Sequence, residues 1–302
     1  PGHVELESLV QRLRELPPGR VHWEGGPGLA RWGNATALSL IPYWTGHPTL
    51  SGLWRESSAL YPFVRWLDAQ LSVAEQPRPY ATEPVGASWD PRRAVDELRM
   101  LGVRYLITHS PETGAAVEAS AALAVARFGD LRLFDIGGAP LVSALGCATS
   151  AVDGQPFREQ SKAWFRSWSQ GTPTLVAAPG FRTREQEACS TAGEPARILM
   201  MDEEHIRFRT EHPGVPHLIR VSYFPNWRAQ GARGPYLASP WFMVVIPQDN
   251  VVDLRFRATS AEWIGWLLTV GGVLGMGLWT MRPWRPRGVM VRPETVSDRG
   301  AR

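Results

Sequence analysis

Cysteine and lysine are the residues that this sequence of 302 residues nearly lacks. Cys147 and Cys189 are the only cysteines, which excludes a disulfide-stapled scaffold and a zinc ribbon built on cysteine ligands. Whether these two cysteines pair stays open, because nothing in the sequence brings them together. Lys162 is the only lysine, so nearly all positive charge is arginine, a bias that we attribute to coding composition rather than to function.

The sequence also lacks the short motifs that mark common catalytic centres. It contains no G-x-S-x-G, H-E-x-x-H, phosphate-binding loop, G-x-G-x-x-G or C-x-x-C pattern. His205, His212 and His217 are loosely spaced, and we find no cysteine or carboxylate pair placed to complete a ligand shell with them. We therefore expect neither a metal site nor a cofactor in this chain, and we interpret the sequon at Asn34 as a chance match.

Positive charge is concentrated at the C-terminal end. Six arginines follow Met281, against Glu294 and Asp298 as the only acids there, so the rest of the chain is close to neutral although the formal net charge is +3. No basic face with interleaved aromatic residues precedes Arg282, which excludes nucleic-acid binding. A hydrophobic content of 44% indicates a folded chain rather than a disordered one.

One long apolar run is present, from Trp263 to Met281 (WIGWLLTVGGVLGMGLWTM). It carries no charge, is close to the roughly 20 residues that cross a bilayer, and has tryptophans at both ends, which a buried core helix does not need. We predict a transmembrane helix over 261–281. Arginines at 282, 285 and 287 follow the positive-inside pattern, so we expect a cytoplasmic basic tail over 282–302 and an extracytoplasmic region over 1–258 of a bacterial cytoplasmic membrane protein.

Glycines in this run predict that the helix packs against another helix. Gly271 and Gly275 have the G-x-x-x-G spacing that permits close helix contact. The partner is either upstream transmembrane helices of the same protein or a second copy of the chain. Because the sequence opens at Pro1 without a signal peptide, we expect it to be a fragment preceded by membrane helices.

Before residue 140, helical and strand patterns alternate, which predicts an extracytoplasmic α/β domain over 1–140. Helices are expected at 4–16, 57–73, 90–102 and 115–126, and strands at 20–23, 103–108 and 131–136. Asp90 followed by Pro91 is a typical helix start.

Over 141–258 the helical period disappears, and short apolar runs separated by Gly, Pro and Asn predict an antiparallel β-sandwich domain. The expected strands are 174–177, 196–201, 205–209, 218–223, 241–246 and 251–257, with 151–184 as a loosely organised connection. The expected fold class is therefore α+β, an N-terminal α/β domain followed by the sandwich and one C-terminal transmembrane helix.

The segment Pro42 to Tyr61 (PYWTGHPTLSGLWRESSALY) combines aromatic and charged residues in a region punctuated by Gly and Pro. Aromatic rings stack on the apolar face of a pyranose while polar groups meet its hydroxyls, so the segment is a candidate glycan-binding site. Packing of these residues in the core of a Trp-rich protein is the more frequent explanation, and both stay open. The candidate residues are Trp44, His47, Trp54, Arg55, Glu56 and Tyr61.

The most specific pattern is VSYFPNWRAQGARGPYLASPWFMVVIPQDNVVDLRF, from Val221 to Phe256. With the apolar run that follows, it resembles the C-terminal end of the YfhO-like bacterial membrane proteins, multi-pass relatives of the GT-C glycosyltransferases. The matching positions are Tyr223, Pro225, Trp227, Gly231, Tyr236, Val244 to Pro247 and Val252 to Phe256. LGVRYLIT from Leu101 and LRLFDI from Leu131 also resemble the extracytoplasmic α/β part of that family.

The resemblance implies a glycosyltransferase that uses a polyprenyl-phosphate-linked sugar for cell-envelope glycan modification. Its acidic catalytic residue would lie in an early loop upstream of this chain, so no catalytic residue is assigned here. This region would then face the acceptor, with membrane lipid, envelope glycan or the polyprenyl-phosphate sugar, and upstream membrane helices as partners. The alternative is a non-catalytic, membrane-anchored envelope protein that binds glycan or a protein partner. A single-span hydrolase is disfavoured, because no set of nucleophile, base and orienting group is visible.

Overall fold

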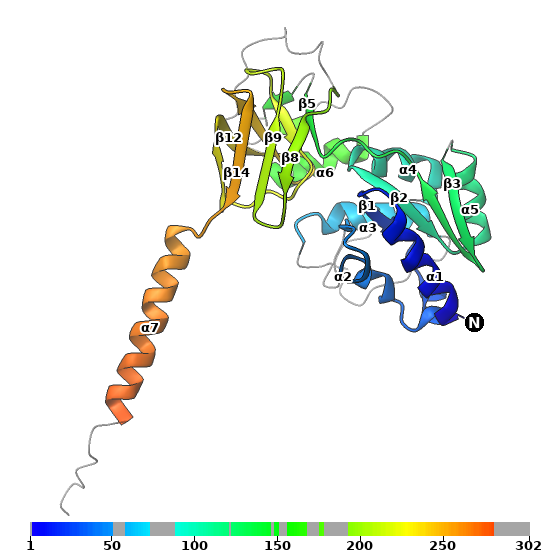
Figure 1. The fold of residues 1–302 in the computed structure, drawn as a ribbon, viewed down its shortest axis with the longest axis horizontal. Helices are drawn as coiled ribbons and strands as arrows, with labels where there is room; N and C mark the ends of the chain where they lie inside the picture. Colours follow the sequence, from blue (N-terminus) through cyan, green and yellow to red (C-terminus); the bar gives the residue numbers. More distant parts are fainter. Residues whose placement is uncertain are drawn as a thin grey trace, which may run out of the picture. The chain divides into compact units, whose positions relative to one another are not determined.

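The computed structural model describes residues 2–50, 58–72, 88–120, 122–145, 148–150, 156–167, 175–177 and 193–280. Within these ranges the chain is a mixed α+β fold with one long C-terminal helix (Figure 1). The chain divides into two compact units, residues 1–257 and residues 258–302.

The first sheet has the strand order β1-β2-β4-β3, formed by Arg20–Trp23, Val103–Thr108, Leu131–Asp135 and Leu123–Phe128. Strands β1 and β2 are parallel, whereas β2, β4 and β3 are antiparallel neighbours. A parallel pair needs a long crossover, and here it contains the helices between the two strands. Those helices are η1 (Pro27–Trp32), η2 (Ala37–Leu40), α2 (Ile41–Thr45), α3 (Tyr61–Leu71) and α4 (Pro91–Met100).

Helices cover both faces of this sheet. On one face, Leu9 and Leu13 of α1 (Gly2–Glu15) pack with Trp23 and Tyr105. On the other face, side chains of α3 and α4 pack with Leu106. Because successive strand residues point to opposite faces, the buried run of β2 supplies both clusters. The local capping is as expected, with Asp90 Oδ1 accepting a hydrogen bond from the Arg93 backbone N–H at 3.1 Å.

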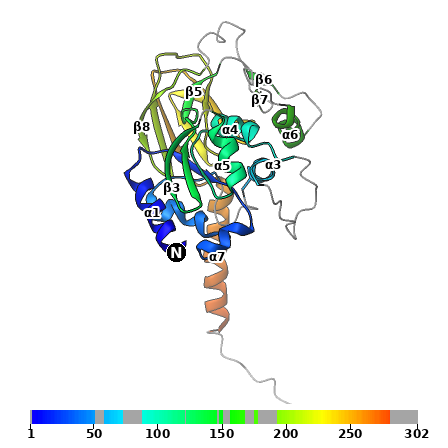
Figure 2. The same ribbon diagram turned by 90° about the vertical axis from the view of Figure 1, so that its right-hand side faces the viewer.

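The sequence after residue 140 forms two further sheets (Figures 1 and 2). The six-stranded sheet has the order β5-β10-β13-β12-β7-β6, formed by Val142–Ala144, His217–Ile219, Phe242–Pro247, Ala232–Ala238, Leu175–Ala177 and Ala148–Ser150. The four-stranded sheet has the order β11-β14-β9-β8, formed by Trp227–Gln230, Val251–Phe256, His205–Arg209 and Arg197–Met201. Phe208 and Leu254 of the second sheet share a buried cluster with Met243 and Val245 of the first, so the two sheets form a sandwich.

The α/β part and the sandwich share one core. Leu218, Phe242 and Val244 of the six-stranded sheet belong to the same hydrophobic cluster as residues of α3 and α4. Helix α6 (Phe157–Ser167) contributes Trp164 and Phe165 to it. The region 1–257 is accordingly a single compact unit, whose core crosses the position near residue 140 where the sequence pattern changes.

Two buried arginines reinforce this junction. Arg220, 8% exposed, donates from Nε to the Met100 carbonyl at 2.9 Å and from Nη1 to the Pro140 carbonyl at 2.6 Å. Its Nη1 also donates to Ser143 Oγ at 2.9 Å. Arg20 donates to the carbonyl oxygens of Leu101 and Arg220, at 2.6 and 2.5 Å. Burial lowers the pKa of both guanidinium groups to about 10, and the charge of the neighbouring Arg20 contributes to the shift of Arg220.

Several expected elements differ from the structure. The helix predicted over 115–126 is wrong, because α5 (Pro111–Glu118) begins earlier and residues 123–128 form β3. Alanine favours helix, but hydrogen bonding of β3 to β4 around the turn at Gly129, with φ of +62°, outweighs that local preference. The strand predicted over 218–223 ends at Ile219, and the pattern did not reveal β11, β12 or α6.

Helix α7 (Ser260–Thr280) is the only helix in the described part of the chain that is long and apolar enough to cross a membrane. Its start is capped reciprocally, since the Glu262 backbone N–H donates to Thr259 Oγ1 at 3.4 Å and the Thr259 N–H donates to Glu262 Oε2 at 2.5 Å. Its large apolar side chains are exposed, as a lipid-facing helix requires. The predicted tail, from residue 282 on, lies outside the described residues.

Candidate functional site

The structure distributes the candidate glycan-binding residues over different environments. Trp44 lies in α2 and is partly buried, His47 is buried after that helix, and Tyr61 is the first residue of α3. The other three candidates, Trp54, Arg55 and Glu56, lie outside the described residues, as do Cys147 and Cys189.

His47 has a packing role in the structure. It is 4% exposed, and its Nε2 and Nδ1 lie 2.8 and 2.9 Å from the carbonyl oxygens of Leu13 and Gly19. Its ring meets the ring of Tyr105 edge-on, with 5.5 Å between centroids. His47 thus connects the end of α1 to the first sheet, and it does not line either pocket described below.

Tyr61 is also separate from Trp44's surroundings. It is partly buried, and the Arg65 guanidinium lies 6.0 Å from its ring centroid. Neither Tyr61 nor Arg65 lines the two pockets considered below.

Trp44 borders a groove along α1, which we call the α1 groove. The cavity volume is about 750 Å³, within the range of ligand pockets. Positions 3, 7, 10 and 14 recur every three or four residues, so they share one helix face, which lies beside the face of the buried Leu9 and Leu13. The lining residues are His3, Leu6, Glu7, Val10, Gln11, Arg14, Arg31, Trp32, Gly33 and Trp44.

Local contacts hold the two tryptophans of the groove. Arg14 Nε donates to the Trp44 carbonyl at 2.7 Å, which fixes the α2 backbone against α1. Trp32 Nε1 donates to Glu5 Oε2 at 2.7 Å, and the Arg31 guanidinium lies 4.8 Å from a Trp32 ring centroid. The groove therefore combines the partly exposed Trp44 indole with guanidinium, amide and carboxylate groups, and Trp32, only 5% exposed, forms its buried wall. Trp32 was missed by the sequence reasoning, because only the tertiary fold brings it beside α1.

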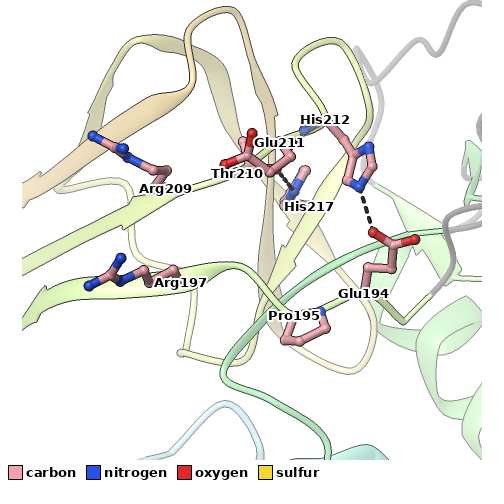
Figure 3. A pocket seen from close by; sticks show the side chains of 8 residues that line it. All are labelled: Glu194, Pro195, Arg197, Arg209, Thr210, Glu211, His212 and His217. Atoms are coloured by element: carbon pink, nitrogen blue, oxygen red, sulfur yellow. Dashed lines mark hydrogen bonds and ion pairs between the residues drawn. The ribbon is translucent and has the colours of Figure 1, made fainter.

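A smaller pocket of about 220 Å³ lies at one end of the sandwich (Figure 3). Figure 3 shows His212 pointing toward Glu194, and the Nε2 atom is 2.5 Å from Glu194 Oε2. His217 points inward, with Nε2 2.7 Å from Thr210 Oγ1, and burial lowers its pKa below the ordinary value of 6.5. Arg197 and Arg209 border the pocket from directly opposite positions on β8 and β9.

The three histidines considered as metal ligands serve separate contacts. His205 pairs with Asp253 at 3.0 Å, whereas His212 and His217 have the partners just described. The described residues contain no group of three or more His, Cys, Asp or Glu side chains arranged to hold a metal.

Ligands often bind at the carboxyl ends of parallel strands, and here the carboxylate after β1 is engaged in internal hydrogen bonds. At the end of β2, Thr108 Oγ1 and His109 Nε2 are buried without a hydrogen-bond partner among the described residues. Glu24, directly after β1 and 1% exposed, accepts from the backbone N–H groups of His109 and Ser110 at 2.9 and 3.0 Å. It also accepts from Ser110 Oγ at 2.6 Å, so its carboxylate serves the start of α5. Of the two pockets described, the α1 groove has the larger volume, and we take it as the candidate ligand site.

Comparison with known proteins adds no assignment, since no family model, curated protein or solved structure matches this chain.

Proposed function

We propose that this chain is the extracytoplasmic, membrane-anchored region of a bacterial envelope protein that binds a saccharide in the α1 groove. In this proposal it is the acceptor-facing part of a YfhO-like membrane glycosyltransferase that uses a polyprenyl-phosphate-linked sugar. The observation that carries the binding proposal is the partly exposed indole of Trp44 beside the polar side chains of α1, with the buried Trp32 forming the wall of the groove.

The chemistry of the groove fits a sugar better than a lipid or a nucleic acid. A pyranose offers an apolar C–H face to an indole ring and hydroxyls to polar side chains. Gln11 and Glu7 supply hydrogen-bond donors and acceptors, while the Arg14 guanidinium also suits an acidic sugar. Arg31 already forms an ion pair with Asp130. Both signs of charge are present, which disfavours a purely anionic polymer as the ligand.

Membrane anchoring by α7 is supported by its 21-residue length and its composition. The extracytoplasmic side follows from the arginines at 282, 285 and 287, which mark the cytoplasmic end of a span. The positive-inside rule applies to the bacterial cytoplasmic membrane, and the resemblance to the YfhO-like family implies the same membrane.

The test of saccharide binding is a pair of neighbouring aromatic substitutions in α2. The full chain in lipid nanodiscs, which avoid sugar-based detergents, is screened against neutral and acidic envelope oligosaccharides and titrated with the best binder. Trp44→Ala should weaken that binding about tenfold, roughly 1.4 kcal/mol, as expected for loss of a stacking ring. Tyr43→Ala is the matched control, because Tyr43 is 87% exposed and does not line the groove.

A second variant separates binding from stability. Glu7 is on the exposed face of α1, so Glu7→Gln keeps the helix while removing a carboxylate from the groove. Reduced affinity with an unchanged melting temperature supports a ligand contact. Equal effects of Trp44→Ala and Tyr43→Ala, or no binder at all, would refute the saccharide site.

The alternative is a non-catalytic envelope protein that binds glycan or a protein partner. It has the same membrane anchor but transfers no sugar. Incubating the nanodisc-bound full-length protein with a polyprenyl-phosphate sugar and the bound glycan distinguishes the two. A glycosylated product supports the glycosyltransferase, and binding without product supports the alternative.

A further inference from the structure

Strand β8 is an exposed edge. Within the described residues it pairs only with β9, and all five of its residues are exposed. Four consecutive apolar side chains follow Arg197, with exposed fractions of 37% for Ile198, 42% for Leu199, 48% for Met200 and 47% for Met201.

Such an edge is unusual for a strand that faces only water. Unpaired N–H and C=O groups of an edge strand are a template for another strand, and proteins usually protect them with lysine, proline or inward-pointing charge. The sequence RILMM has no lysine, proline or inward-pointing charge within its apolar part. Its register against β9 does shift between Ile198 and Met200, and a bulge is a further device that protects edges. An added strand would satisfy the free backbone groups and cover the four side chains.

The two ends of β8 carry opposite charge. Arg197 lies directly opposite Arg209 on β9, an unfavourable like-charge pair, and neither guanidinium has an ion-pair partner among the described contacts. At the other end, the turn Asp202, Glu203 and Glu204 is exposed and acidic, and no ion pair with a cation is found there in the described residues.

We propose that β8 pairs antiparallel with β8 of a second copy of this chain. Antiparallel pairing centred near Leu199 brings the Arg197 end of each copy to the acidic turn of the other, so both unmatched charge groups gain partners at once. A parallel partner would place like charges together. A surface of anionic lipid would attract Arg197 but repel the acidic turn. The strand is therefore complementary to itself, and α7, if it anchors the chain as proposed above, confines the copies to one membrane.

Cross-linking of the full chain in native membranes tests the pairing. In a Cys147→Ser, Cys189→Ser background, Leu199→Cys should give a covalent dimer with a short bis-maleimide. Leu123→Cys is the matched control, because Leu123 is a 68% exposed leucine on β3, the edge strand of the first sheet. A dimer from Leu199→Cys alone supports the proposal, and equal yields from both positions, or none from either, overturn it.

Charge reversal tests the orientation. Adding Arg197→Glu should reduce the Leu199→Cys dimer severalfold, because each copy then presents acid to acid. Adding Asp202→Arg and Glu203→Arg to that variant should restore the dimer. Unchanged cross-linking in Arg197→Glu, or no restoration by the swap, refutes antiparallel pairing. Oligosaccharide binding by the same variants reports on the α1 groove separately, so the failure of either proposal is recognised independently.

Discussion

Removing the Arg220 side chain should loosen the junction between the α/β part and the sandwich. Arg220→Met keeps much of the buried aliphatic volume but leaves Met100 O, Pro140 O and Ser143 Oγ without their donor. Hydrogen bonds to a charged group contribute roughly 1.5 to 3 kcal/mol each. Relief from burying the charge offsets part of this loss, because burial lowers the pKa of Arg220 to about 10, a shift that corresponds to roughly 3 kcal/mol.

The expected net loss is roughly 2 to 6 kcal/mol, a large fraction of the stability of a typical protein. Arg220→Lys should recover only part of it, because a single ammonium cannot reproduce the separate directions of Nε and Nη1. The assay is urea unfolding of the full chain in nanodiscs, followed by tryptophan fluorescence and by hydrogen exchange of the segments around residues 100 and 140.

Arg233→Met is the control, because Arg233 is an exposed arginine of β12. Substitutions at exposed positions usually change stability by about 0.5 kcal/mol or less. If Arg220→Met and Arg233→Met unfold at the same urea concentration with the same exchange pattern, the three acceptors are satisfied by water. The junction would then not depend on the buried guanidinium.

Two further predictions concern pH and topology. Burial lowers the pKa of His217, so the unfolded chain takes up a proton near pH 6.5 before the folded chain does. The stability that neutral His217 contributes is therefore complete above pH 6.5 and is lost as the pH falls below that value. His217→Gln should make the urea midpoint of unfolding less dependent on pH between pH 7 and pH 5. An unchanged pH dependence of the midpoint would contradict this. A reporter that is active only in the cytoplasm should be active when it is fused after Arg302. Activity of a reporter that works only outside the cytoplasm, fused at the same position, would reverse the proposed sidedness.

The sequence by itself determined the elements whose signals are local. Asp90 and Pro91 predicted the start of α4, because a capping side chain and a proline at the first turn act within one turn of helix. VRYLIT predicted β2, and the uncharged run before Met281 predicted α7, because burial of a strand and crossing of a bilayer both require continuous apolar residues. The α+β class follows from the change of hydrophobic period near residue 140.

Tertiary structure alone decided the rest, since it depends on which distant residues meet. Residues 123–128 are strand because β4 is available to pair with them. His47 is a packing residue because the ends of α1 and the first sheet offer carbonyls to both ring nitrogens. The α1 groove combines residues from α1, η1 and α2, and Arg20 reaches the Arg220 carbonyl across 200 positions of sequence. Local patterns carry no information on such encounters, because shape and burial are properties of the assembled core.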